Sequence, residues 1–122
     1  MKKNKINILG TEYKIVIKSE EEEPRLKRSW GFTDVYAKKI YIASDWTKET
    51  EESCRNLIDF KKKVIRHEII HAFLYESGMK ECSSATQSWV ENEEMVDWFA
   101  IQIPKIVKIY KELDILWQKN QK

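Results

Sequence analysis

The two histidines of this 122-residue chain lie in one short segment, RHEIIH, where their spacing suggests metal chemistry. His67 and His71 are four residues apart, and Glu68 directly follows the first. In an α-helix, a step of four residues places two side chains on one face, so both imidazoles can bind the same ion. Zinc is the predicted metal, because imidazole suits it and a three-ligand site leaves a position for water. Glu68 is then expected to be the general base of an H-E-x-x-H motif rather than a ligand.

A pair of hydrogen-bonded histidines on an apolar helix is the alternative, because H-E-x-x-H is short enough to occur by chance. The periodicity favours the metal site, since apolar residues and the histidines recur at steps of three and four from Leu57 to Leu74. Gly78 then supplies a helix C-cap. A later acidic segment can also provide a third ligand, so the pattern indicates a metal-binding helix.

The segment ENEEMVDW, residues 91–98, supplies the carboxylates. An exposed acidic face is the alternative, but the apolar neighbours argue against a fully solvated helix. Glu93 and Asp97 are about 40° apart in a helical projection, whereas Glu94 points about 100° away from Glu93. We therefore expect Glu93 to be the third metal ligand. Asp97 is expected to accept a hydrogen bond from a ligand histidine.

RHEIIHAFLYESG followed by NEEMVDWFA resembles the zincin metallopeptidases, specifically the gluzincin pattern of H-E-x-x-H plus a glutamate on a later helix. The resemblance covers roughly residues 30–105 and implies the same three zinc ligands and the same role for Asp97. The order of elements is similar to that of compact phage and prophage peptidases, which include the ImmA/IrrE-type repressor-cleaving proteins. The chain departs from thermolysin-type enzymes because it has no further histidine. The oxyanion stabiliser therefore stays open between Tyr75, Tyr36 and a backbone N–H.

The expected fold is α+β, a minimal zincin-like domain over residues 1–122 with a small sheet of about three strands before the helices. Alternating β-branched and aromatic residues predict strands at 13–17, about 32–36 and 40–43, with the apolar segment 6–9 before a turn or bulge at Gly10. The charged stretch 19–29 and residues 79–88 are expected to be loops. The active-site helix is expected to start within or just after the polar segment 45–56. Two C-terminal helices are expected, with Pro104 marking a break or kink between them.

Charge is nearly balanced, with 22 basic and 20 acidic residues, so neither a nucleic-acid nor a membrane partner is implied. The basic segment KKKVIR, residues 61–66, is interpreted as part of a solvated helix face. Cys54 and Cys82 form no C-x-x-C motif, which favours a reduced, cytoplasmic protein. The sequence has no apolar run long enough for a membrane span and no signal-peptide pattern at its start.

These patterns predict a zinc-dependent endopeptidase that cleaves an intracellular protein and is encoded by a phage or prophage. A catalytically silent metal-binding interaction module is the alternative, but a structural site has no need of a base at Glu68. A SprT-like peptidase of DNA-bound proteins would be expected to carry a further basic or zinc-binding module. Core packing and positions at a partly exposed rim are the expected roles of the five tryptophans. Trp30, beside Gly31, can instead border a groove where an extended peptide adds to an edge strand.

Overall fold

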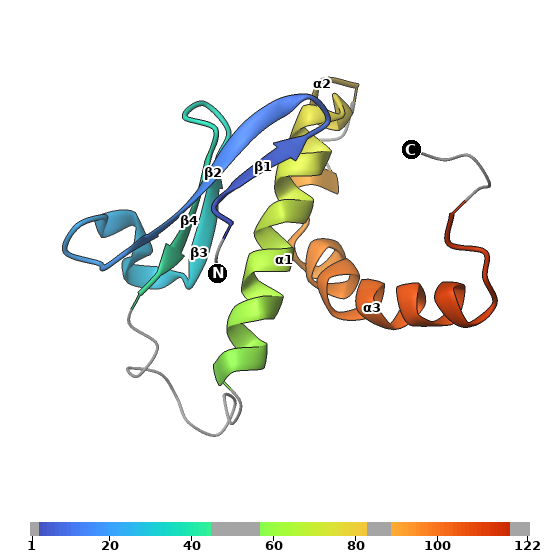
Figure 1. The fold of residues 1–122 in the computed structure, drawn as a ribbon. Helices are drawn as coiled ribbons and strands as arrows, with labels where there is room; N and C mark the ends of the chain where they lie inside the picture. The colour runs from blue at the N-terminus through green and yellow to red at the C-terminus, as the bar shows by residue number, and fades with distance from the viewer. Residues whose placement is uncertain (1–2, 45–56, 83–88, 118–122) are drawn as a thin grey trace.

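The computed structural model describes residues 3–44, 57–82 and 89–117 (Figure 1). It has the predicted α+β fold, in which an N-terminal sheet is followed by helices. The sheet has four strands rather than about three. In chain order, the elements are β1 (Lys5–Ile8), β2 (Thr11–Lys18), the 3-10 helix η1 (Pro24–Arg28), β3 (Gly31–Asp34), β4 (Lys39–Ala43), α1 (Leu57–Glu76), α2 (Met79–Cys82), the 3-10 helix η2 (Trp89–Glu91) and α3 (Glu93–Glu112).

The strands are arranged in the order β1-β2-β4-β3, with β2 parallel to β4 and the other two pairs antiparallel. The additional strand is β1. Leu9 and Gly10 have positive φ angles of 50° and 95°, so they form a tight two-residue turn that pairs β1 with β2. β3 is at an edge of this sheet and ends earlier than predicted, because the Asp34 carboxylate accepts the N–H groups of Tyr36 and Ala37 and starts the next turn.

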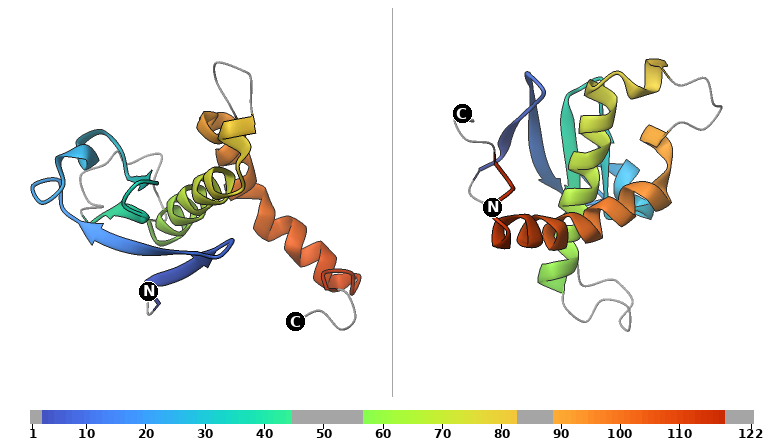
Figure 2. Two further views of the ribbon diagram at one scale, coloured as in Figure 1. Left: turned by 90° about the horizontal axis from the view of Figure 1, so that it is seen from above. Right: turned by 90° about the vertical axis from the view of Figure 1, so that its right-hand side faces the viewer.

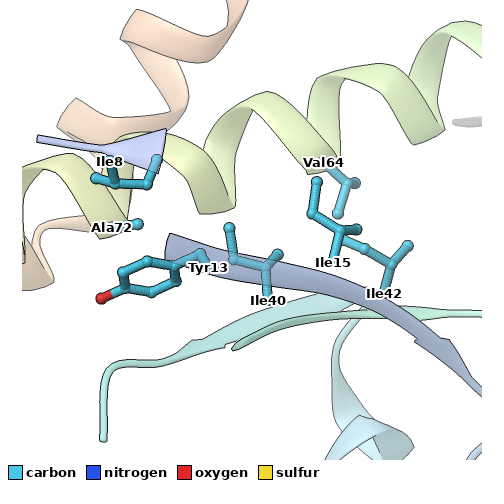
Figure 3. Packing of buried hydrophobic residues seen from close by; sticks show 7 residues of the cluster. All are labelled: Ile8, Tyr13, Ile15, Ile40, Ile42, Val64 and Ala72. Carbon is cyan, nitrogen blue, oxygen red and sulfur yellow. The ribbon is translucent and has the colours of Figure 1, made fainter. Parts of the chain in front are cut away.

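The main core lies between one face of the sheet and α1 (Figure 3). Val64 and Ala72 of α1 face alternate residues of β2 and β4, each of which is at most 5% exposed: Tyr13, Ile15, Ile40 and Ile42. Burial of a large apolar side chain contributes about 1.5–3 kcal/mol, so this layer holds α1 on the sheet. The core does not extend to Ile17, which is 44% exposed although it was predicted on the same strand face.

Gly31 allows α1 to lie close to the edge strand β3. A Cβ atom at this position would be 2.9 Å from the carbonyl oxygen of Tyr41 and 3.3 Å from a methyl group of Val64. Any larger residue would therefore push β3 away from β4 or from α1. The close approach matters for the site, because it brings Thr33 of β3 against Glu68 of α1.

The end of α1 is as predicted, whereas two predicted loops contain short helices. Gly78 has a φ of 84° and its N–H donates to the carbonyl oxygen of Tyr75 at 3.2 Å, so it caps the helix. The polar segment 45–56, from which α1 was expected to start, lies outside the described residues. In the first predicted loop, Pro24 starts η1, which buries Leu26. In the second, α2 follows Gly78 directly.

α3 is one continuous helix, so the prediction of separate helices before and after Pro104 is wrong. Proline has no N–H, and the carbonyl that this group would normally reach is that of Ala100. Arg66 of α1 donates a hydrogen bond from Nε to this carbonyl at 2.7 Å. A contact from the neighbouring helix thus compensates for the missing bond, and the helix continues through the proline.

α3 begins after Asn92, whose side-chain oxygen accepts the N–H of Met95 and caps the helix. Its first half packs on α1, and its second half extends away from both α1 and the sheet (Figure 2). Among the described residues, no helix is both long and apolar enough to cross a membrane.

Candidate metal centre

Three side chains from α1 and the first turn of α3 converge on one point. The rings of His67 and His71 lie one helical turn apart, with centroids separated by 4.9 Å. Glu93 Oε1 lies 2.8 Å from Nε2 of His67 and 3.2 Å from Nε2 of His71. The ligand atoms of the three residues are all within 4.8 Å of one another, so this group can hold a metal ion.

The second nitrogen of each imidazole is held by a hydrogen-bond acceptor. His71 Nδ1 lies 2.6 Å from the carbonyl oxygen of Val90, which precedes α3. His67 Nδ1 lies 3.1 Å from Asp97 Oδ1, one turn along α3 from Glu93. A carbonyl or carboxylate oxygen can only accept, so each Nδ1 carries the hydrogen. In the neutral imidazoles, each Nε2 therefore presents a lone pair toward Glu93.

The donor set fits a divalent cation. Two Nε2 lone pairs and a carboxylate oxygen face one another, and the neutral imidazoles leave no hydrogen between them. Such an arrangement is repulsive unless protons or a metal cation lie among the three atoms. Burial opposes ionisation of Glu93, whereas imidazoles that donate toward its carboxylate outweigh this and lower the pKa of the carboxyl. Two imidazole nitrogens and one carboxylate oxygen are a ligand set that zinc commonly takes.

Glu68 lies beside this cluster without joining it. The residue is 7% exposed, and burial raises the pKa of its carboxyl, although Thr33 and both histidines oppose the shift. The Thr33 hydroxyl is 2.8 Å from Glu68 Oε1 and 2.9 Å from the carbonyl oxygen of Glu68, so it holds this residue at the edge of the sheet. Thr33 was not singled out from the sequence, where one polar residue in a short strand carries no signal of this contact.

Asp97 contacts not only His67 but also Lys63, which is predicted from the sequence to be solvated. Lys63 Nζ lies 2.9 Å from the same Oδ1 that faces His67. Burial of Asp97 opposes its ionisation, but Lys63 and His67 outweigh this and lower the pKa of the carboxyl. Arg66 of the same basic segment also contacts α3, through Ala100. The interpretation of residues 61–66 as a solvated face is therefore wrong for these two side chains.

Two cavities flank the three converging side chains. One, of about 300 Å³, includes Thr33, Glu68, His71 and Tyr75. The other, of about 290 Å³, has Trp30 and Phe60 in its wall together with His67 and Glu68. Gly31 of the edge strand lines both.

The remaining candidate residues differ in how close they lie to the three converging side chains. Tyr75 lines the first cavity and also a third one that the histidines do not line, whereas Tyr36 is 95% exposed and lines only the third among these cavities. Glu94 is exposed and is not part of the His67–His71–Glu93 group, as the helical phase predicted.

Comparison of this chain with protein-family models, with curated proteins and with solved structures finds no match.

Proposed function

We propose that the protein is a zinc-dependent peptidase. The observation that carries this proposal is the convergence of two imidazole Nε2 atoms and one carboxylate oxygen, with both Nδ1 atoms already hydrogen-bonded. The buried carboxyl of Glu68 beside them supports catalysis over simple metal storage, because a structural site needs no additional carboxylate held apart from the ligands.

Each residue has a separate role in this proposal. His67, His71 and Glu93 would hold the ion. A bound zinc ion lowers the pKa of a coordinated water toward about 7 and polarises a carbonyl group. Glu68 would accept a proton at its carboxylate and pass it to the leaving amine.

Asp97 and the Val90 carbonyl would orient the two imidazoles. Each fixes the hydrogen on Nδ1 and leaves Nε2 available as a ligand. Lys63 keeps Asp97 ionised and therefore supports its role as an acceptor.

The substrate we propose is an extended segment of an intracellular bacterial protein. β3 is an edge strand, and Gly31 lines the cavities on both sides of the three ligands. A peptide that added to this edge would form main-chain hydrogen bonds and pass beside Glu68. Trp30 and Phe60, whose rings are 5.6 Å apart, would meet one of its side chains in the second cavity. A phage or prophage origin is included in the proposal only because of the sequence resemblance.

The test combines metal analysis with cleavage of a peptide library prepared from a bacterial proteome. Wild-type protein purified without chelator is expected to carry about one zinc ion per chain and to cleave a subset of the peptides, detected by mass spectrometry. Glu68→Gln should keep the zinc and the circular-dichroism spectrum but lose activity by about 10²- to 10⁴-fold. Glu94→Gln makes the same change of charge at an exposed position and should cleave like the wild type.

Three outcomes would count against the proposal in different ways. Wild-type protein that takes up no zinc would rule out the metal centre. Cleavage by Glu68→Gln at the wild-type rate would rule out the assigned base. Zinc binding without any cleavage by the wild type would instead favour the catalytically silent interaction module.

A further inference from the structure

Pro104 leaves one carbonyl of α3 without its usual partner. In an α-helix the N–H of residue 104 would bond to the carbonyl of residue 100, but proline has no N–H. Ala100 is fully buried, so water is not an available substitute for this group. Its carbonyl oxygen instead accepts a hydrogen bond from Arg66 Nε at 2.7 Å.

This contact joins α1 and α3 next to the metal centre. Arg66 directly precedes His67, and Ala100 follows Asp97 by three residues on α3. Within the part of the chain that the structure describes, four further polar contacts between these two helices run through the candidate ligands or through Asp97. The Arg66–Ala100 bond is different, because it involves neither a candidate ligand nor the partner of one. This bond can therefore fix the position of α3 along α1 before any metal binds.

We propose that Arg66 is a positioning residue: it replaces the missing N–H of Pro104 and so fixes Glu93 and Asp97 of α3 opposite the histidines of α1. Apolar packing alone, as at Val96 and Ala100, is non-directional and tolerates sliding of one helix along the other. A hydrogen bond to one carbonyl does not tolerate such sliding, because its strength falls steeply with misalignment. Metal sites need ligand distances within about 0.2 Å, so a small slide would affect binding.

This inference rests on the proposed metal centre, and its test separates the two. Four proteins are compared with the wild type: Arg66→Met, Pro104→Ala, the double variant, and Lys62→Met. Lys62 is an exposed residue of α1, so its substitution controls for the loss of a positive charge. The dissociation constant for zinc is measured by competition with a chromophoric chelator. Urea unfolding of the metal-free protein, in the presence of chelator, is measured alongside.

Arg66→Met should weaken zinc binding about 10- to 100-fold, as loss of a supporting contact usually does, and should lower the urea midpoint. In the double variant, the N–H of the new alanine can bond to the Ala100 carbonyl, so the midpoint should recover. Zinc binding should stay weak, because the contact between the helices is still missing. Lys62→Met should match the wild type in both measurements.

Zinc binding by Arg66→Met within about twofold of the wild type would overturn the proposal. Recovery of zinc binding together with the midpoint in the double variant would also overturn it, since Arg66 would then serve only to satisfy the carbonyl. If Arg66→Met does not fold, the double variant decides: zinc binding within about twofold of the wild type would overturn the proposal. Wild-type protein that binds no zinc would refute the metal centre and, with it, the ligand-positioning role. Urea unfolding would still show whether Arg66 and Pro104 are coupled.

Discussion

Substitution of Glu93 or Glu94 by alanine gives the sharpest test of the candidate centre. Both residues are acidic and lie in the first turn of α3, so each loses a similar favourable interaction with the helix dipole. They differ in direction. Both side chains are exposed, but Oε1 of Glu93 lies within 3.2 Å of both Nε2 atoms, whereas Glu94 lies outside the cluster. Glu94→Ala is therefore a matched control for Glu93→Ala.

The expected size of the effect can be worked out from mass action. Zinc at 100 times the wild-type dissociation constant should stabilise the folded protein by about 2.7 kcal/mol, which is a rise of roughly 10 °C in melting temperature for a domain of this size. If loss of Glu93 weakens binding 100-fold, the same zinc concentration gives about 0.4 kcal/mol, or roughly 2 °C. Glu94→Ala should keep the full shift.

The metal-free proteins provide a second criterion. The Glu93 side chain is 73% exposed, so its removal should change the metal-free melting temperature only slightly. Loss of a metal ligand is thus expected to reduce the zinc-induced shift in melting temperature and to leave the metal-free melting temperature nearly unchanged. The assay is differential scanning fluorimetry with and without zinc, after treatment with chelator. Retention of the full shift in Glu93→Ala, or its loss in Glu94→Ala, would refute the assignment of Glu93.

Two further predictions concern contacts around the site and away from it. Asp97→Ala should weaken zinc binding by about 10- to 100-fold, less than Glu93→Ala, because it frees His67 Nδ1 without removing a ligand; equal losses in competitive titration would contradict this order. Glu76 accepts hydrogen bonds from Thr11, Tyr13 and Lys38, and its contacts with Lys38 first and Tyr13 second lower the pKa of the carboxyl. Its stabilisation is therefore present above the unfolded-state pKa of about 4.3 and is lost as the pH falls through the lower folded-state value. Glu76→Gln should cost about 2 kcal/mol in urea unfolding at pH 7 and converge on the wild type once the pH is below the folded-state pKa, and a difference independent of pH would exclude this account.

The parts of the site that follow from local periodicity could be predicted from the sequence. The spacing of His67, Glu68 and His71 fixes their relative directions once the segment is helical, and α1 is helical across them. The same reasoning applied to residues 93–97 distinguished Glu93 from Glu94, and the structure places Glu93 at the histidines. In both cases, the information lies within a few residues of one element.

The parts that depend on contacts between distant elements could not be predicted. Thr33 reaches Glu68 across 35 positions in the sequence, and only because Gly31 lets the edge strand approach α1. Lys63 was predicted to be solvated, since a run of lysines is usually a solvated face. Its contact with Asp97 exists only once α3 lies against α1.

At Pro104, too, a contact from a distant element decides the structure, but here it preserves a helix that the local sequence predicts to end. Its helix-breaking tendency is a sound local rule, and in isolation the predicted boundary was reasonable. The rule fails here because the lost hydrogen bond is replaced from another helix by Arg66. The residues around Pro104 do not indicate this contact, because Arg66 lies 34 positions before Ala100 in the chain.

The centre therefore depends on how α3 lies against α1. α1 alone carries both imidazoles and Glu68, and an i, i+4 histidine pair on one helix can bind a metal weakly by itself. The carboxylate of Glu93 and both acceptors that orient the rings, Val90 and Asp97, come from the segment that contains η2 and the start of α3. Docking of this segment completes the ligand set and fixes both tautomers in one step. Metal affinity should accordingly follow the stability of the α1–α3 contact more closely than the stability of the sheet.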